Sequence, residues 1–314
     1  MTIRYVEPLS RGYQRMRKAL FPVDVKKWFV VGFTAFLSGL TDCGGGNGTG
    51  SRSQGRVDWE EVIYFPRHAW EWLAENPVWA TVIAFAAFVV FVIVVLCIWW
   101  SSRGKFMFLD NVVHDRAQVI APWNEYRAEG NSLFLWSLVL WFVFLAIIGW
   151  YIVHCFITVQ ALYETGGDLR LLIGPIVMMA LGFFAILLVG GFIDMLLYEF
   201  VVPIMYRDRI TTSQAVRKML PLFMSQFFYF LGYGLFSLAI IVAVVIGIVI
   251  VGLLTCCIGF LFFAIPYINS VVLLPVSYTL RAFSLEFLGQ FGPEYRVFTD
   301  STAAPSGTVS TSGK

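Results

Sequence analysis

The sequence predicts an all-α protein, a polytopic transmembrane helical bundle of about six spans with amphipathic helices at the membrane surface. Five uninterrupted apolar stretches carry this prediction: Pro77–Trp100, Ser132–Gln160, Leu171–Leu197, Phe227–Gly252 and Thr255–Leu280. At about 1.5 Å of helical rise per residue, each can cross a hydrocarbon layer about 30 Å thick. The composition agrees, because 59% of the residues are hydrophobic and only 13% are charged, against about 25% charged in soluble proteins.

A sixth and shorter apolar segment, Trp28–Leu40, makes only about 20 Å of helix. If it crosses and the N-terminus is inside, 18 of the 22 Lys and Arg residues lie on the inner side; if it does not, the split is 11 to 11. Since inner loops carry the excess of basic residues, we expect six spans in a prokaryotic cell (plasma) membrane, with both termini cytoplasmic. A re-entrant or interfacial segment and a signal-peptide core are the alternatives for this segment.

Residues 1–290 are expected to form a single transmembrane helical domain, and residues 291–314 a disordered cytoplasmic tail. The inner segments share a pattern that suggests a threefold repeat of one interfacial helix and two crossings. Four residues recur at a constant offset of 200: Gln14, Arg17, Lys18 and Leu20 match Gln214, Arg217, Lys218 and Leu220. A plain series of helix hairpins is the alternative.

The stretch Tyr5–Leu20 predicts an amphipathic helix, since apolar residues recur every three or four positions and basic residues occupy another face. The basic residues proposed to face lipid, on this helix and on its matching stretch, are Arg11, Arg15, Lys18, Arg217 and Lys218. Anionic membrane lipid is the expected partner. A helix that caps the bundle and contacts protein only is an equal alternative. The net charge of +2 gives no indication of nucleic acid.

Outside the membrane, the longest excursion is Thr41–Asn76. Its first part is rich in glycine and predicts a flexible loop. Its second part combines tryptophans with acidic residues and predicts a helical lip on the outer leaflet, because aromatic residues with a polar group prefer the membrane interface. A docking surface for another protein is the alternative.

Ionisable side chains inside a bilayer are costly and therefore indicate a specific role. Asp194 lies near the inner end of its span, and we expect it to form an intramembrane ion pair with Arg281. Proton or ion handling by Asp194 is the alternative. His154 is expected to be an interfacial hydrogen-bonding residue. Pro266 and Pro275 interrupt the sixth span and could create a broken helix of the kind that transporters use.

Enzyme motifs are missing from the sequence. The three histidines, His68, His114 and His154, are too far apart for a paired helical metal site, and no HExxH, GxSxG or P-loop motif occurs. We therefore expect no enzyme activity, no catalytic residue, no metal and no cofactor.

Three short stretches carry a family resemblance: QRMRKALFPV at 14–23, KWFVVGF at 27–33 and RGKFMFLD at 103–110. The chain resembles an uncharacterised prokaryotic multi-pass membrane family and, more distantly, the membrane domain attached to some bacterial glycerophosphodiester phosphodiesterases. The resemblance implies no activity, because the phosphodiesterase catalytic domain does not occur in this sequence. The expected function is to organise lipid or partner proteins at the membrane, and the alternative is a small-molecule or lipid transporter that uses the broken sixth span and Asp194.

Overall fold

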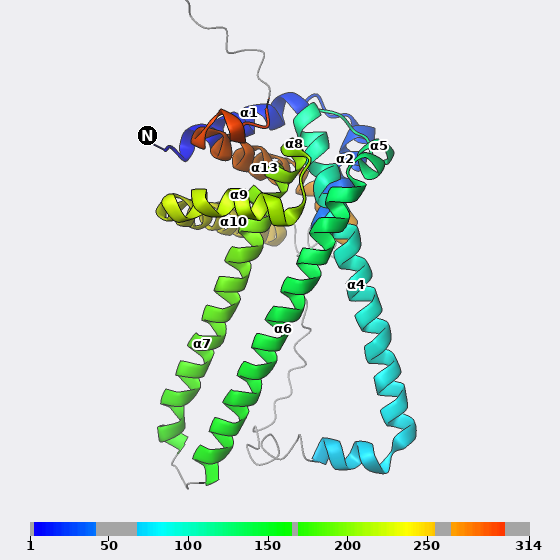
Figure 1. Ribbon diagram of the computed structural model, residues 1–314, viewed down its shortest axis with the longest axis vertical. Helices are drawn as coiled ribbons and strands as arrows, with labels where there is room; N and C mark the ends of the chain where they lie inside the picture. The colour runs from blue at the N-terminus through cyan, green and yellow to red at the C-terminus, as the bar shows by residue number, and fades with distance from the viewer. Residues whose placement is uncertain (1–2, 42–67, 165–168, 255–264, 299–314) are drawn as a thin grey trace, which may run out of the picture.

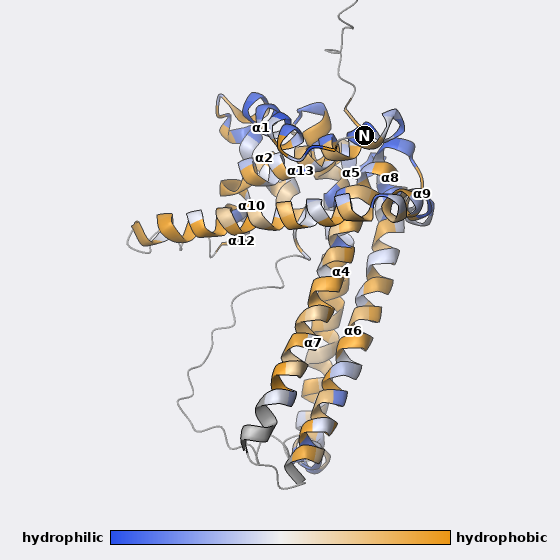
Figure 2. Cartoon of the chain, turned by 90° about the vertical axis from the view of Figure 1, so that its left-hand side faces the viewer, coloured by the Kyte–Doolittle hydropathy of each residue, from blue (hydrophilic) through white to orange (hydrophobic). Residues whose placement is uncertain are grey.

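Three long apolar helices extend in one direction from a head of shorter helices in the computed structural model, which describes residues 3–41, 68–164, 169–254 and 265–298 (Figure 1). They are α4 (Pro77–His114), α6 (Arg127–Glu164) and α7 (Leu169–Leu196). Away from the head these helices consist mostly of apolar residues (Figure 2), and protein buries only 0 to 6% of the most apolar 18-residue stretch of each. A helix that is apolar all round and not covered by protein is suited to a lipid environment.

The number of spans is smaller than the sequence predicted. Within the described residues, four helices are long and apolar enough to cross a membrane: α4, α6, α7 continued to Asp208, and α10 (Phe227–Leu254). The fourth helix, α10, lies crosswise to the other three at the level where they meet the head (Figure 2). The expectation of about six spans is therefore corrected to about four candidate spans, one of which, α10, lies crosswise to the others, while the helical class is confirmed.

The head contains most of the remaining helices of the described chain, and residues 68–75 form a further helical stretch at the opposite end. At its centre, α7 continues without a break through a π-helical turn into a short helix. Pro203 lies in the first turn of that short helix, where the missing backbone N–H of proline is tolerated. The elements of the head are α1 (Val6–Leu20), α2 (Val25–Ser38), α5 (Ile120–Glu125), η2 (Leu197–Val201), α8 (Val202–Asp208), α9 (Thr212–Ser225), α12 (Pro266–Val272), α13 (Leu274–Leu288), η3 (Gly289–Phe291) and η4 (Pro293–Tyr295).

The segment Trp28–Leu40 is not among the described helices that are long enough to cross a membrane. It forms α2, whose last residues lie beside Ser101 at the start of the buried part of α4, since the Ser101 hydroxyl donates a hydrogen bond of 2.9 Å to the Ser38 carbonyl. A Cβ added to Gly104 would lie 2.6 Å from the Leu37 carbonyl carbon, so only glycine lets the two backbones approach this closely. Protein covers the apolar face of α2, and hydropathy cannot distinguish that cover from lipid.

The stretch Thr255–Leu280 is not a single span either. Residues 255–264 lie outside the described part, and the rest forms α12 and the first half of α13, both in the head. The two helices meet at Leu273, directly before Leu274 and Pro275, where the proline ends the preceding hydrogen-bond ladder. The predicted break is present, but it lies within protein rather than along a crossing helix.

Helix α1 packs one face onto α13, as the alternative of a capping helix requires, while its contact with lipid stays a prediction. Its buried residues are Pro8, Gly12, Met16, Ala19 and Leu20. A Cβ on Gly12 would lie 3.0 Å from backbone atoms of α13, which explains the close approach. Helix α1 lies at the end of the head away from the long helices (Figure 1).

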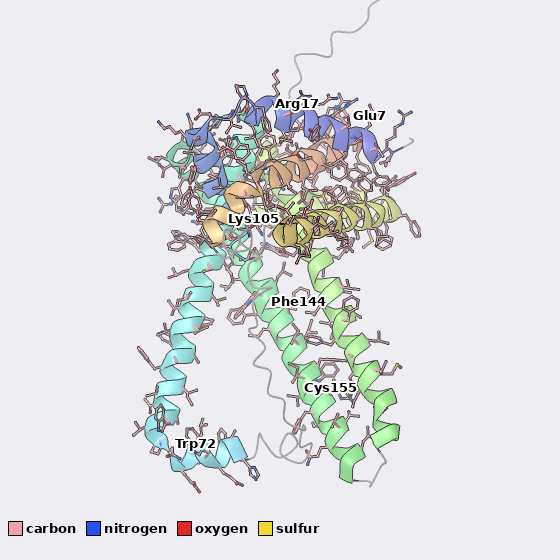
Figure 3. All side chains as sticks on the ribbon, turned by 180° about the vertical axis from the view of Figure 1, so that it is seen from behind. Glu7, Arg17, Trp72, Lys105, Phe144 and Cys155 are labelled. Carbon is pink, nitrogen blue, oxygen red and sulfur yellow. The ribbon has the colours of Figure 1, made fainter. Side chains whose placement is uncertain are left out.

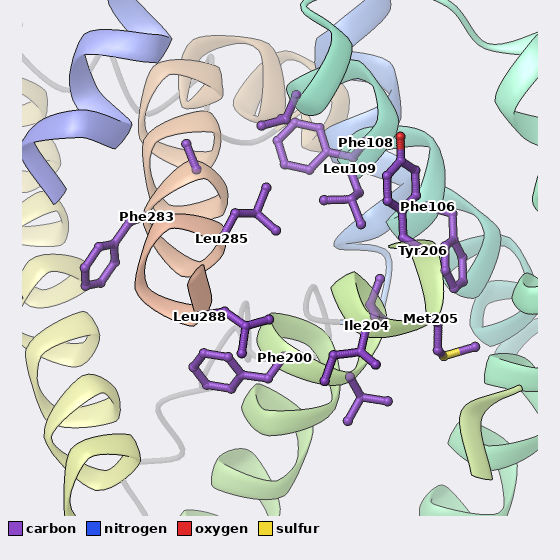
Figure 4. Close-up of a cluster of buried hydrophobic side chains, with 14 of the residues drawn as sticks. Phe106, Phe108, Leu109, Phe200, Ile204, Met205, Tyr206, Phe283, Leu285 and Leu288 are labelled. Carbon is purple, nitrogen blue, oxygen red and sulfur yellow. The ribbon is translucent and has the colours of Figure 1, made fainter. Parts of the chain in front are cut away.

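Aromatic side chains fill the middle of the head. Phe200 contacts the rings of Phe230 and Tyr233 with centroids 4.9 and 5.0 Å apart, and Phe283 stacks on Tyr233 at 4.9 Å. Figure 4 shows this core joining α13, η2, α8 and the end of α4. Such edge and offset contacts add to the stability that burial supplies.

The ordered head extends further than predicted, because part of the expected tail 291–314 packs on it. Phe291 stacks on Phe230 with centroids 5.1 Å apart, and the Arg15 guanidinium lies 3.8 Å from the centre of the Phe298 ring. Residues 299–314 lie outside the described part, as does the glycine-rich part of the Thr41–Asn76 excursion.

Both ends of the described chain lie in the head, on the same side of the long helices. The basic residues that the sequence assigned to the inner side, apart from Lys314, also belong to the head or to the helix ends that enter it. At the opposite end, residues 68–75 are helical and carry the exposed Trp70 and Trp72 (Figure 3). The distribution of basic charge between the two ends is therefore strongly unequal.

Candidate functional site

The head meets the long helices at a sharp change from exposed to buried side chains. Along α4, Trp100 is 45% exposed and the next residue, Ser101, is completely buried. Along α7 the same change falls between the exposed Ile193 and the buried Leu197. The exposed Trp79 and Trp100 lie near the two ends of the apolar part of α4, roughly 30 Å apart along the helix, which matches a hydrocarbon layer. A bilayer that covers this apolar length would place its headgroups at the boundary.

A cavity of about 220 Å³ lies at this boundary, between the end of α2 and the helices α4, α6 and α7; its lining is mostly apolar, and we call it the polar cavity only for the few polar and charged side chains that share it. Its polar lining residues are Thr41, Ser101, Ser102, Lys105, Ser137 and Asp194. Figure 3 shows Lys105 at the level where the head begins, above Phe144 of α6. Two opposite charges therefore face one small space at the membrane boundary.

Lys105 is the basic residue of this cavity; only 4% of the residue is exposed, but its ammonium nitrogen is not itself fully buried and opens to the cavity. Its ammonium nitrogen lies 5.2 Å from the centre of the Tyr198 ring, which is a cation–π contact. Within the described chain it has no hydrogen-bond acceptor and no carboxylate within ion-pair distance. In the sequence analysis, Lys105 was only one of the 18 basic residues assigned to the inner side of the membrane. Its position directly after a long apolar run was the available signal.

Arg281 approaches the same tyrosine, with its guanidinium carbon 4.3 Å from the Tyr198 ring centre. It is 1% exposed, donates a hydrogen bond of 2.8 Å to the Tyr198 carbonyl, and lies 3.5 Å from the Glu199 carboxylate. The Nε and Nη2 atoms of Arg281 are buried without a hydrogen-bond partner in the described part of the chain. Arg281 and Lys105 thus place two positive charges around one ring, with Glu199 beside the first.

The expected ion pair between Asp194 and Arg281 is wrong. The carboxylate within 4.0 Å of Arg281 belongs to Glu199, which lies in the π-helical turn. Asp194 precedes that turn by more than half a helical turn, is exposed, and faces the polar cavity instead. The π-turn rotates Glu199 toward α13, a local change that a regular helical reading of the sequence cannot predict.

On the other side of α7 is a larger, apolar groove of about 640 Å³ between α7, α10 and α13. Exposed side chains of α7 and α10 line it, among them Leu188, Leu235 and Leu238. Glu199, Tyr233 and Ser237 supply its polar lining atoms. The groove is therefore mostly hydrocarbon in character but includes a carboxylate and two hydroxyl groups.

A separate polar network joins α4 to α8 inside the head. The fully buried Asp110 carboxylate accepts hydrogen bonds of 2.8 to 3.0 Å from Arg116 and one of 2.9 Å from the Tyr206 hydroxyl. The Nδ1 atom of His114 lies 3.1 Å from the same carboxylate. The hydrogen bonds to Asp110 raise the pKa of the Arg116 guanidinium above its ordinary value. The network satisfies a buried charge and needs no ligand to explain it.

The basic residues proposed for lipid contact have mostly protein partners. Arg11 and Arg15 form ion pairs with Glu286 at 3.7 and 2.8 Å. Lys218 lies 2.5 Å from the Asp208 carboxylate. Lys18 and Arg217 are exposed and lie on different helices of the head, α1 and α9. These five residues therefore do not form one lipid-facing surface.

His154 lies on α6, in the apolar region away from the head, with its ring stacked on Trp150 at 5.7 Å between centroids. Among the described residues, no group of three His, Cys, Asp or Glu side chains is arranged to hold a metal ion.

The long apolar helices and the helical head define the chain as a polytopic helical membrane protein. The chain belongs to a family of unknown function (DUF7544), whose model matches residues 4–276. No curated protein and no solved structure matches it. The predicted membership of an uncharacterised membrane family is confirmed at this level, and no match links the chain to glycerophosphodiester phosphodiesterases.

Proposed function

We propose that the chain is a non-enzymatic membrane protein that binds and organises lipid where its head meets its apolar helices. The observation that carries this proposal is the apolar groove between α7, α10 and α13. Its volume is enough for a substantial part of an acyl chain, and its lining leucines are exposed on the surface that lipid would contact. An acyl chain in the groove would cover apolar surface on both helices without needing any catalytic group.

The test is the amount of lipid that remains with the purified full-length protein. Gly191 lines the groove and a Cβ built there meets nothing within 4 Å, so Gly191→Phe should fill the space without a clash. Gly149 of α6 is equally open but lies outside the groove, so Gly149→Phe is the matched control. Mass spectrometry should find at least one tightly held lipid per protein in the parent and the control, and less in Gly191→Phe. Equal retention in all three would contradict the proposal.

The excess of basic residues at the head supports a cytoplasmic head in a cell membrane. Anionic lipid of the inner leaflet remains the proposed partner, with the exposed Lys18 and Arg217 as free charges for it. Labelling of single cysteines placed at these two positions in intact cells tests the sidedness. Both should be protected from an impermeant reagent, whereas the exposed Trp72 position at the opposite end should react.

Transport remains the second proposal, because Asp194 faces a polar cavity at the membrane boundary. The described lining of that cavity comes from α4, α6, α7 and Thr41, and not from the broken sixth span. A transport role would therefore use Asp194 without Pro266 or Pro275. Loss of uptake in reconstituted vesicles on Asp194→Asn would favour transport over lipid organisation.

A further inference from the structure

We propose that the polar cavity between α4, α6 and α7 binds a compact zwitterion of the phosphoethanolamine type, with Lys105 holding the phosphate and Asp194 the ammonium group. The cavity is separate from the apolar groove, and the inference rests on the lipid binding proposed above only where the zwitterion is a lipid headgroup. A soluble molecule of the same chemistry would bind by the same two contacts.

The first argument is the unsatisfied charge of Lys105. An ammonium group has three hydrogen-bond donors, and enclosing it in a small, mostly apolar space without protein acceptors is unfavourable even where the nitrogen opens to the cavity. The face of Tyr198 compensates only in part, and the guanidinium of Arg281 on the same ring adds positive potential. An anionic group in the cavity would supply the acceptors that Lys105 lacks. A phosphate has several acceptor oxygens for a single ammonium group.

The second argument is the position of Asp194. Its carboxylate lines the same cavity but is not within 4.0 Å of Lys105 or of any other described basic side chain, and no described residue donates a hydrogen bond to it. It stands on α7 among apolar residues such as Ile193 and Leu197, where a lone charge is unfavourable. Two opposite charges that share a cavity without pairing can each bind the complementary end of a zwitterion.

The size and depth of the cavity indicate which zwitterion fits. A volume of about 220 Å³ is below the usual range of about 300–1,000 Å³ for drug-sized ligands, so it suits a headgroup rather than a whole lipid. The change from exposed to buried side chains at Trp100 and Ser101 places it where headgroups lie. A primary ammonium can donate hydrogen bonds to Asp194, whereas a choline group cannot, so ethanolamine should be preferred to choline.

The experiment uses the full-length protein in nanodiscs with equal amounts of phospholipids that carry ethanolamine, choline or glycerol headgroups on identical chains. Native mass spectrometry measures which lipid each variant retains. The parent protein should retain the ethanolamine lipid about tenfold over the glycerol lipid, equivalent to about 1.4 kcal/mol. Asp194→Asn should reduce that ratio to about one, because only the phosphate contact remains. Lys105→Met should lower retention of both lipids.

Matched controls separate these effects from general loss of charge or fold. Lys26 and Glu75 are exposed, lie away from the cavity and have no side-chain ion pair in the described chain, so Lys26→Met and Glu75→Gln should behave like the parent. Lys105→Arg keeps the charge and should keep the preference if the protein folds. The groove variant Gly191→Phe should lose total lipid but keep the headgroup ratio, so failure of the groove proposal is distinguishable from failure of this one.

A second arm titrates the same variants in detergent with soluble glycerophosphoethanolamine. Saturable binding that both Asp194→Asn and Lys105→Met abolish would support a soluble zwitterion as the ligand. Preference in nanodiscs without soluble binding would support a lipid headgroup. No headgroup preference and no soluble binding in the parent, or a preference unchanged in Asp194→Asn, would overturn the proposal and leave a water-filled cavity.

Discussion

Arg281 of α13 lies 3.5 Å from Glu199, the third residue of the π-helical turn that follows α7. The same arginine donates a hydrogen bond to the carbonyl of the neighbouring Tyr198. These contacts fix the C-terminal part of the chain to the head end of a long apolar helix. The π-turn is therefore a structural junction, because it turns Glu199 toward the head and leaves Asp194 facing the polar cavity.

Glu199→Gln should destabilise the protein strongly. The change leaves the guanidinium of Arg281, which is 1% exposed, without its carboxylate. Breaking a buried ion pair from one side typically costs about 3–5 kcal/mol. Thermal unfolding in detergent should show a clear fall in midpoint temperature. Asp194→Asn, with no ion pair to lose, should unfold near the parent temperature, and the double change Glu199→Gln with Arg281→Met should recover part of the loss.

Gly104→Ala should weaken the contact between α2 and α4. The new Cβ would lie 2.6 Å from the Leu37 backbone carbonyl carbon, so one helix must shift. Overpacking of this kind costs about 1–3 kcal/mol. Gly247→Ala in α10 is the matched control, because a Cβ there meets nothing within 4 Å and alanine is the better helix former. If the two variants unfold at the same temperature, the close approach of α2 to α4 is wrong.

Burial raises the pKa of the Tyr278 phenol above its ordinary value of 10.0, and its hydroxyl donates a hydrogen bond of 3.1 Å to the Val112 carbonyl. With the folded pKa raised, the unfolded chain loses this proton first as the pH rises above 10. The stabilising contribution is therefore complete below pH 10 and falls on the alkaline side. Tyr278→Phe should reduce the slope of stability against pH in that range by up to about 1.4 kcal/mol per pH unit. An unchanged alkaline slope would show that this phenol is not buried in the folded state.

The sequence was a good guide to the helices that protein does not cover. The expected stretches Pro77–Trp100, Ser132–Gln160 and Leu171–Leu197 all lie within or nearly within α4, α6 and α7 with its π-turn. Hydropathy identifies such segments because every side chain faces the same apolar surroundings. The charge pattern also placed the basic residues together at one end.

The errors arose where protein replaces lipid as the apolar neighbour. Gly32 of α2 packs against Val271 of α12, and Leu37 of α2 packs against Gly104 of α4. The head therefore covers an apolar face of α2 that suggested a crossing. The partner of Arg281 was missed because its identity depends on the π-turn, which shifts the helical register at Glu199. Lys105 was missed because the sequence shows only its position directly after a long apolar run, and not that the folded chain encloses it without a carboxylate partner. The threefold repeat stays a prediction.

The orientation of α10 can be measured directly. Its side chains are apolar all round, yet it lies crosswise to α4, α6 and α7. Spin labels at Leu235, Val245 and Leu253, all exposed, should therefore report nearly the same depth in a bilayer. Labels at Val78, Phe85 and Ile93 of α4 are the control series, and their depth should change by about 1.5 Å per residue as the helix crosses. If the α10 labels also change depth at that rate, α10 crosses the membrane, and the apolar groove would have to be formed between two crossing helices.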